Sequence, residues 1–166
     1  MIDVQAHAVA SHVLALEGLH LDRQDWDAWL ALYADDVEYW VPAWKSESEL
    51  VSDVQREVSL IYHTTRVGLE ERLMRIRSRK SVTAMPMPRT AHAVSNVLVH
   101  ESTPDRIDGT ASWVVHEYDP RTTKTHVHFG LYEFTLRHAG NQWKIARKKT
   151  VLHNDMIPTV IDFYNL

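Results

Sequence analysis

Two histidines in the sequence have a spacing that can bind a metal ion. His126 and His128 are separated by one residue, so in a strand both side chains point to the same face. Such a pair can ligate zinc or iron. The sequence places no third ligand, because HExxH is absent and no carboxylate is spaced to complete a facial triad. We therefore interpret these histidines, and the others in the chain, as structural or surface residues.

An acid/base pair is the second kind of chemistry that the residues could supply. A catalytic histidine needs a carboxylate that faces it. In a small α+β domain with an internal pocket, His92 could meet Asp35 or Asp36, and Tyr39 and Tyr118 could complete the site. The same residues serve equally as helix caps and as buried, hydrogen-bonded groups. Both interpretations stay open at this point.

Several other classes of chemistry are excluded by what the chain lacks. It has no cysteine, which excludes disulfides, thiol catalysis and thiolate ligands for zinc or iron–sulfur clusters. It has no GxSxG nucleophile motif. Its five glycines are scattered rather than gathered in a phosphate-binding loop. The sequence therefore predicts neither a nucleophile site nor a phosphate site.

A basic run, RLMRIRSRK, covers residues 72–80 of a chain that is acidic overall. Residues 66–80 carry a net charge of +4, whereas residues 1–40 carry −7, from eight acids against Arg23. Charges separated in this way suit pairing between subunits, and the planar arginine fork suits interface ion pairs. A solvated helix face is the alternative. No nucleic-acid site is predicted, because aromatic side chains do not interleave with the arginines.

The bulk composition fits a single globular domain over residues 1–166. Apolar residues make up 45% and charged residues 24% of the chain, and the net charge is −4. These values are typical of a protein that buries an ordinary core. The N-terminus has no basic lead and no unbroken apolar stretch, so we expect neither a signal peptide nor a membrane anchor. The expected location is the cytoplasm.

Helical patterns dominate the first half of the chain. Glu17 falls off the apolar face of a helix predicted over residues 2–21. Asp22 could cap a second short helix over residues 25–33, and residues 37–44 read as a short strand stopped by Pro42. The side chains that define the apolar face of the first helix are Val9, Val13, Leu16 and Leu19.

The segment from Arg66 to Lys80 fits two periods. Leu69, Leu73 and Ile76 lie on one face of a helix, whereas residues 74–80 also alternate as a strand would. Its leucine, glutamate, arginine and methionine residues are good helix formers. We predict a helix, preceded by a polar, irregular stretch over residues 45–60.

The second half changes to long alternating segments rich in valine, threonine and aromatic residues. A proline-punctuated loop at residues 84–90 leads into them, and short turn signals separate them. Strands in this order form an antiparallel meander. Helices first and a curved sheet afterwards predict an α+β fold with the helices packed on one face of the sheet. The four predicted strands cover residues 90–102, 106–118, 125–138 and 142–155.

Residues 66–99 resemble the small (β) subunits of bacterial Rieske-type aromatic-ring-hydroxylating dioxygenases. Residues 25–44 and the tail 148–166 resemble the same family, so the resemblance extends over essentially the whole chain. The helix positions that match are Gly68, Leu69, Glu70, Arg72, Arg75 and Arg77. The matching loop and strand positions are Pro88, Arg89, Thr90, His92, Asn96 and Val97.

The resemblance implies a cystatin-like, nuclear-transport-factor-like cone that assembles with a large (α) subunit, commonly as an α3β3 hexamer with a trimer of small subunits. In this family the large subunit carries the Rieske 2Fe–2S cluster and the mononuclear iron, so no cofactor is expected in this chain. The benzoate, toluate and anthranilate group is the most similar. Its members add O2 to an aromatic carboxylate, giving a cis-dihydrodiol, with electrons from NADH delivered by a reductase.

The resemblance therefore implies a structural subunit of an oxidoreductase that supplies no catalytic residue itself. The alternative is a stand-alone dehydratase or isomerase of the same cone fold, in which His92 would act with Asp35 or Asp36, near Tyr118. For the structural subunit we predict contacts to other subunits, without nucleic acid or membrane. The predicted interface residues are Trp44, Arg72, Arg75, Arg77, Arg79 and Arg89.

Overall fold

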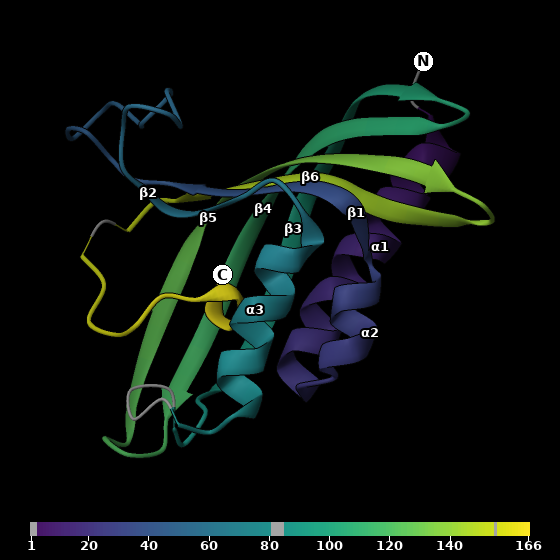
Figure 1. Ribbon diagram of the computed structural model, residues 1–166. Coiled ribbons are helices and arrows are strands. Elements are labelled where there is room, and N and C mark those ends of the chain that lie inside the picture. Colours follow the sequence, from purple (N-terminus) through teal and green to yellow (C-terminus); the bar gives the residue numbers. More distant parts are fainter. Residues whose placement is uncertain (1–2, 81–84, 155) are drawn as a thin grey trace.

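The structure, a computed structural model, describes residues 3–80, 85–154 and 156–166. Within these residues, three helices and a short 3-10 helix accompany one large sheet (Figure 1). The helices are α1 (Val4–Arg23), α2 (Trp26–Ala31), α3 (Arg66–Arg77) and η1 (Phe163–Asn165). The strands are β1 (Tyr33–Pro42), β2 (Ser59–His63), β3 (Arg89–Thr103), β4 (Arg106–Asp119), β5 (Lys124–Ala139) and β6 (Gln142–Leu152).

The six strands form one curved sheet in the order β2-β1-β6-β5-β4-β3, with the helices on one side of it (Figure 1). The predicted α+β class and the antiparallel meander from β3 to β6 are confirmed. The sheet as a whole is mixed rather than antiparallel, because β1 runs parallel to β6. Strand β6 pairs with β1, although β2, α3 and the other strands of the meander lie between them in the sequence. Local sequence patterns do not reveal this crossover.

Helix α1 confirms the predicted helix in its described part but buries a different face. Leu19 is 39% exposed, whereas Glu17 is only 2% exposed. The Asp3 side chain caps the helix by accepting a hydrogen bond from the Ala6 amide at 2.9 Å. Small residues let this face approach the sheet closely. The buried positions are Ala6, Ala10, Val13, Leu14, Glu17, Gly18 and Leu21.

The boundaries of the next two elements differ from the prediction. Helix α2 is preceded by Asp25 at its N-cap, so the predicted capping role of Asp22 is wrong. Asp22 lies inside the last turn of α1 and contacts β3 instead. Strand β1 begins at Tyr33, four residues earlier than predicted, because Tyr33 already pairs with Ile145 of β6.

Helix α3 settles the ambiguity between helix and strand in favour of the helix. It continues to Arg77, and Arg79 then takes a left-handed conformation with φ of 54°. The predicted apolar face is buried: Leu69, Leu73 and Ile76. The helix lies close to β2 at Gly68, where an added Cβ would come within 2.2 Å of His63 Nδ1. Of the predicted loop 84–90, Ala84 lies outside the described residues, and β3 begins at Arg89.

The C-terminal tail folds back against the helices and completes the core (Figure 1). Phe163 stacks on Trp29 of α2, with ring centroids 4.5 Å apart. Phe163 and Leu166 are both 0% exposed. The space between helices and sheet is therefore closed by the last residues of the chain. In the part of the chain described, no helix is long and apolar enough to cross a membrane.

Candidate functional site

A buried ion pair lies between the helices and the sheet. Lys148 of β6 places Nζ 2.7 Å from Oε1 of Glu17 in α1, and the two side chains are 1% and 3% exposed. The Tyr33 hydroxyl donates a hydrogen bond to the same carboxylate oxygen. Lys148 Nζ also lies 3.9 Å from the centroid of the Tyr132 ring. These groups are sealed from solvent, so a dissolved substrate does not reach them in this conformation.

Burial dominates the electrostatics of this cluster. It lowers the pKa of Lys148, because desolvation penalises the ammonium, while the charge of Glu17 acts in the opposite direction. Burial also raises the pKa of Tyr33 well above its ordinary value, and the neighbouring Glu17 charge adds to this effect. The tyrosine is therefore a neutral donor, and the cluster consists of one ion pair in which Oε1 of Glu17 also accepts the Tyr33 hydrogen bond.

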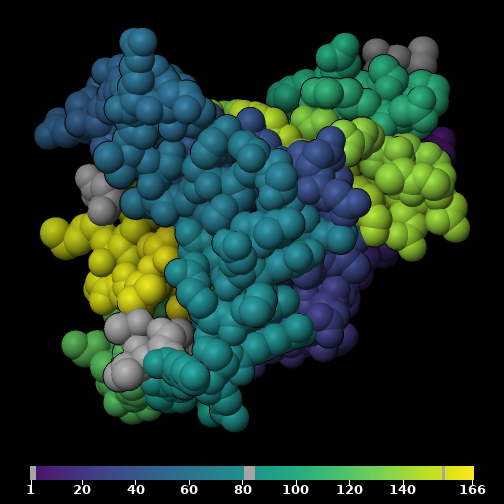
Figure 2. All heavy atoms as spheres, in the orientation of Figure 1, coloured from purple at the N-terminus to yellow at the C-terminus, as the bar shows by residue number. Residues whose placement is uncertain are grey.

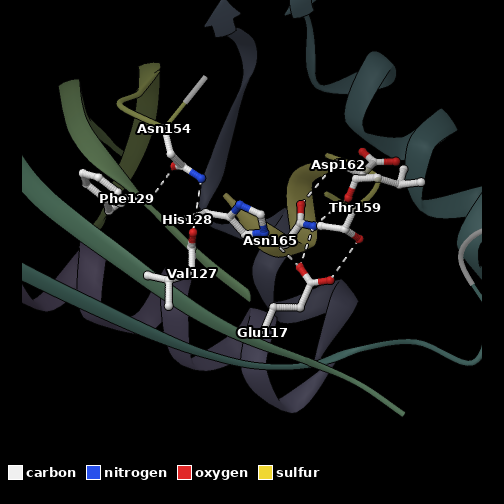
Figure 3. Close-up of polar contacts among 9 residues, drawn as sticks. Glu117, Val127, His128, Phe129, Asn154, Thr159, Asp162 and Asn165 are labelled. Carbon is white, nitrogen blue, oxygen red and sulfur yellow. Dashed lines mark hydrogen bonds and ion pairs between the residues drawn. The ribbon is translucent and has the colours of Figure 1, made fainter. Parts of the chain in front are cut away.

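A second buried polar cluster ties the C-terminal tail to the sheet (Figure 3). Glu117 of β4 lies 3.3 Å from His128 Nε2 of β5. Its carboxylate accepts hydrogen bonds from the Asn165 side-chain amide at 2.8 Å and from the Thr159 hydroxyl at 3.3 Å. Burial by itself raises the pKa of Glu117, but the hydrogen bonds from His128 and Asn165 outweigh it, so the pKa is lowered.

Two further contacts hold the tail in place. The Asn154 side chain accepts from the Phe129 amide and donates to the Val127 carbonyl, both at 3.2 Å, as a neighbouring strand would (Figure 3). Asp162 accepts a hydrogen bond from Arg72 of α3 at 2.9 Å. The tail is thereby attached to β5 and to α3 as well as to β4.

Replacing Glu117 with glutamine is expected to lower the free energy of unfolding by about 1.5–3 kcal/mol at pH 7, the range for hydrogen bonds to a charged group. The pKa of Glu117 in the folded protein is below its ordinary value of 4.5. Its stabilising contribution is therefore present above that value and is lost as the pH falls through the folded pKa. The difference in unfolding free energy between wild type and variant should therefore become smaller as the pH is lowered. Urea unfolding at several pH values measures this difference.

Glu101→Gln is the matched control for this experiment, because Glu101 lies exposed on β3. We expect it to change the unfolding free energy by less than about 0.5 kcal/mol at any pH. If the difference in unfolding free energy between wild type and Glu117→Gln were the same at neutral and acidic pH, the folded protein would not stabilise the ionised form of Glu117.

Of His126 and His128 on β5, only His128 is buried, and it has a polar partner. His128 is 0% exposed and contacts Glu117, while His126 stands opposite Glu117 in the strand register. Within the described ranges, no three histidine, cysteine, aspartate or glutamate side chains gather to hold a metal ion. A Rieske cluster also needs two cysteine ligands, and the chain has none. The residues of this chain therefore do not fit that group.

The predicted acid/base site does not form from the predicted residues. His92 Nδ1 lies 2.5 Å from Oδ1 of Asp22, and not beside Asp35 or Asp36. Asp35 pairs with Arg66 at 2.9 Å, and Asp36 pairs with an arginine of β5. The alternative in which His92 acts with Asp35 or Asp36 is therefore wrong, because both aspartates lie exposed at the start of β1.

The two predicted tyrosines also lie apart from His92. Tyr39 is 1% exposed in the core. Tyr118 stacks under Arg89, whose guanidinium carbon is 5.8 Å from the ring centroid.

Asp22 is the carboxylate that sequence reasoning missed at His92. It accepts hydrogen bonds from the Thr90 hydroxyl and from the His92 amide, both at 2.9 Å. Burial raises its pKa, but the hydrogen bonds from His92 outweigh burial and lower it. The glycine at position 18 is the one sequence feature that could have indicated a close approach of α1 to β3. In the structure, an added Cβ at Gly18 would lie 2.9 Å from the His92 Cβ. The contact ties the end of α1 to β3.

Of the six residues predicted at a subunit interface, several make contacts inside this chain. Arg72 donates to His63 Nε2 at 2.8 Å and to Asp162. Burial and the adjacent Arg72 charge lower the pKa of His63, which suits its role as a neutral acceptor. Trp44 donates from its indole nitrogen to the Leu152 carbonyl at 2.6 Å. Arg72 and Trp44 therefore have structural roles within the subunit.

The other predicted interface residues are closer to solvent. Arg77 pairs with Asp27 of α2 at 2.7 Å, with both side chains substantially exposed. Arg89 covers Tyr118. Arg75 and Arg79 are exposed, and no described residue forms an ion pair or hydrogen bond with either side chain.

A known protein family matches most of the chain. Residues 17–159 match the model of the family described as ring hydroxylating beta subunit. The 2-halobenzoate 1,2-dioxygenase small subunit of Burkholderia cepacia is 38% identical over 146 residues, covering 88% of this chain and 87% of that protein. The benzoate 1,2-dioxygenase subunit beta of Acinetobacter baylyi is 35% identical, covering 100% of this chain and 97% of that protein.

Solved structures agree with the sequence comparison. The beta subunit of the benzoate 1,2-dioxygenase from Burkholderia mallei superposes with a TM-score of 0.80 at 31% identity, covering 100% of this chain and 99% of that one. The cone-shaped α+β fold expected from the sequence is confirmed by this similarity.

Proposed function

The chain belongs to the ring hydroxylating beta subunit family, and from this premise we propose that it is the structural small subunit of a benzoate-type 1,2-dioxygenase. Relatives that are small or beta subunits of benzoate, halobenzoate, anthranilate and toluate 1,2-dioxygenases support the proposal. The single observation that carries it is this similarity over nearly the full length. The whole chain, residues 1–166, then forms one small-subunit domain.

The proposed reaction adds O2 to the ring of an aromatic carboxylate and yields a cis-dihydrodiol, with electrons that a reductase takes from NADH. The iron centres belong to the large subunit. This chain supplies no cysteine ligand, and its interior acids and bases are paired with one another. Its contribution is a rigid body on which the large subunits are held in position.

The proposed assembly contains three small and three large subunits and works in the cytoplasm. Closure of the core by the C-terminal tail leaves each small subunit with a compact, self-contained interior. Such a body can form contacts through its outer surface without exposing its core. Exposed arginine side chains on α3 offer one such surface.

Co-expression with the large subunit of the same enzyme is expected to yield a stable complex with equal numbers of both chains, measured as mass in solution. Purified alone, the small subunit should bind no stoichiometric iron and should not turn over benzoate. The complex should contain iron and show oxygenase activity. A small subunit that ignores the large subunit, or that turns over an aromatic acid on its own, would overturn the proposal.

A further inference from the structure

The acidic residues of the N-terminal region already have partners within this chain. This region of residues 1–40 could in principle attract the arginines of a second copy, but the structure shows intramolecular contacts for each of its eight acids. Four pair with arginines: Asp27 with Arg77, Asp35 with Arg66, Asp36 with Arg137 and Glu38 with Arg147. The other four contact neutral or basic groups: Asp3 with Ser102, Glu17 with Lys148, Asp22 with His92 and Asp25 with His20.

The C-terminal end of α3 is left with uncompensated positive charge. Arg75, Arg79 and Lys80 are exposed, and in the described part of the chain no acid forms an ion pair with them. Glu71, four residues before Arg75, lies on the same side of the helix but makes no such pair. Figure 2 shows the outer side of α3, in teal, across the middle of this face of the molecule.

An apolar side chain lies within the same surface. Met74 is 69% exposed beside Arg75, while the opposite face of α3, at Leu73 and Ile76, is buried. An exposed, flexible thioether next to an exposed arginine is typical of a contact surface, since both methionine and arginine are enriched at protein interfaces. We define the basic end of α3 as Met74, Arg75, Arg79 and Lys80.

Stabilisation of the helix terminus explains only part of this charge. Cations in the last turn interact favourably with the helix dipole, an effect that falls off within that turn. Arg75 and Arg77 occupy it. Arg79 follows the helix in a left-handed conformation, with φ of 54°, which is uncommon for a residue other than glycine, asparagine or aspartate. Its charge and that of Lys80 lie beyond the helical residues.

We propose that the basic end of α3 docks against a carboxylate-rich surface of the large subunit. The inference rests on the proposed function, which supplies the large subunit as a partner. A second copy of this chain is the less suitable occupant, because seven of the eight acids in its N-terminal region already face a basic side chain of their own subunit. The arginines supply charge complementarity and hydrogen-bond donors, and Met74 supplies an exposed apolar contact.

The test uses the double variant Arg75→Glu/Arg79→Glu, co-expressed with the large subunit. We expect its affinity for the large subunit to fall at least about tenfold, because two attractive pairs become repulsive. The loss should be greater at low than at high ionic strength, since salt screens the repulsion. The mass of the isolated small subunit and its unfolding midpoint should stay as in wild type, because no described residue pairs with either arginine side chain.

Arg23→Glu/Arg56→Glu is the matched control, because it changes the net charge equally at exposed sites on α1 and in the 45–60 loop. It should assemble like wild type. Assembly of the Arg75/Arg79 variant at wild-type affinity would overturn the docking surface while leaving the proposed function intact. Failure of wild type itself to bind the large subunit would overturn the proposed function. A variant that loses self-association but still binds the large subunit would assign the surface to a second copy instead.

Discussion

Replacing Lys148 with methionine is expected to lower the free energy of unfolding by about 3–5 kcal/mol, the usual cost of removing one partner from a buried ion pair. Glu17 would remain 2% exposed with no cation beside it. Its negative charge would then be buried without compensation, which costs more than the interaction that was removed. Urea unfolding at neutral pH, followed by tryptophan fluorescence, measures the loss.

A double variant, Glu17→Gln/Lys148→Met, separates the buried charge from packing. It leaves no ion at this position in the core, and the Gln carbonyl can still accept the Tyr33 hydroxyl hydrogen bond. We expect it to recover more than half of the stability lost in Lys148→Met. The control is Lys149→Met, because Lys149 pairs with Glu133 at 3.0 Å near the surface and should cost less than about 1 kcal/mol. If Lys148→Met and Lys149→Met lost equal amounts of unfolding free energy, burial of the ion pair would not explain the cost.

Replacing Phe163 with alanine is expected to cost about 3–5 kcal/mol of unfolding free energy, the range for truncating a buried phenylalanine. The ring is 0% exposed. It stacks on Trp29 and meets Trp26 edge-on, with centroids 5.5 Å apart. Its removal leaves a cavity between α2 and the tail that the rigid indoles cannot fill. Thermal and urea unfolding of the isolated small subunit measure the effect.

Met156→Ala is the control in the same tail, because Met156 is 86% exposed. Its effect should stay within about 0.5 kcal/mol. If Phe163→Ala were as mild as Met156→Ala, the tail would be a peripheral attachment rather than part of the core. If Phe163→Ala loses the expected unfolding free energy, the tail is part of the core. Truncations of the tail should then reduce the yield of folded subunit.

Most elements of the fold could be predicted because they follow from local periodicity. The 3.6-residue repeat of Leu69, Leu73 and Ile76 identified α3 correctly. Alternation identified the four meander strands to within two residues at their beginnings. Periodicity was less reliable in α1, where Gly18 and Glu17 lie on the buried face. Hydrophobicity alone cannot predict a buried carboxylate, because its burial depends on a partner elsewhere in the chain.

The functional contacts depended on pairings between distant residues. Glu17 and Lys148 are 131 positions apart, and Asp22 and His92 are 70 positions apart. Both pairs form because the sheet brings β6 next to β1 and lets α1 lie against β3. The Arg72 contact with Asp162 likewise requires the tail to fold back onto α3. No local pattern specifies which carboxylate meets which base.

The family resemblance, the α+β class, the absence of thiolate ligands and the concentration of arginine on one helix could all be inferred from the amino-acid sequence alone. Each of these is a property of residue types and their spacing along the chain. How the charges are distributed among partners depends instead on the three-dimensional packing. It paired the acids of residues 1–40 within the subunit and left Arg75 and Arg79 exposed. The reason is physical: Coulomb attraction and hydrogen bonding act over a few ångströms in space, and distance in space is set by how the elements pack.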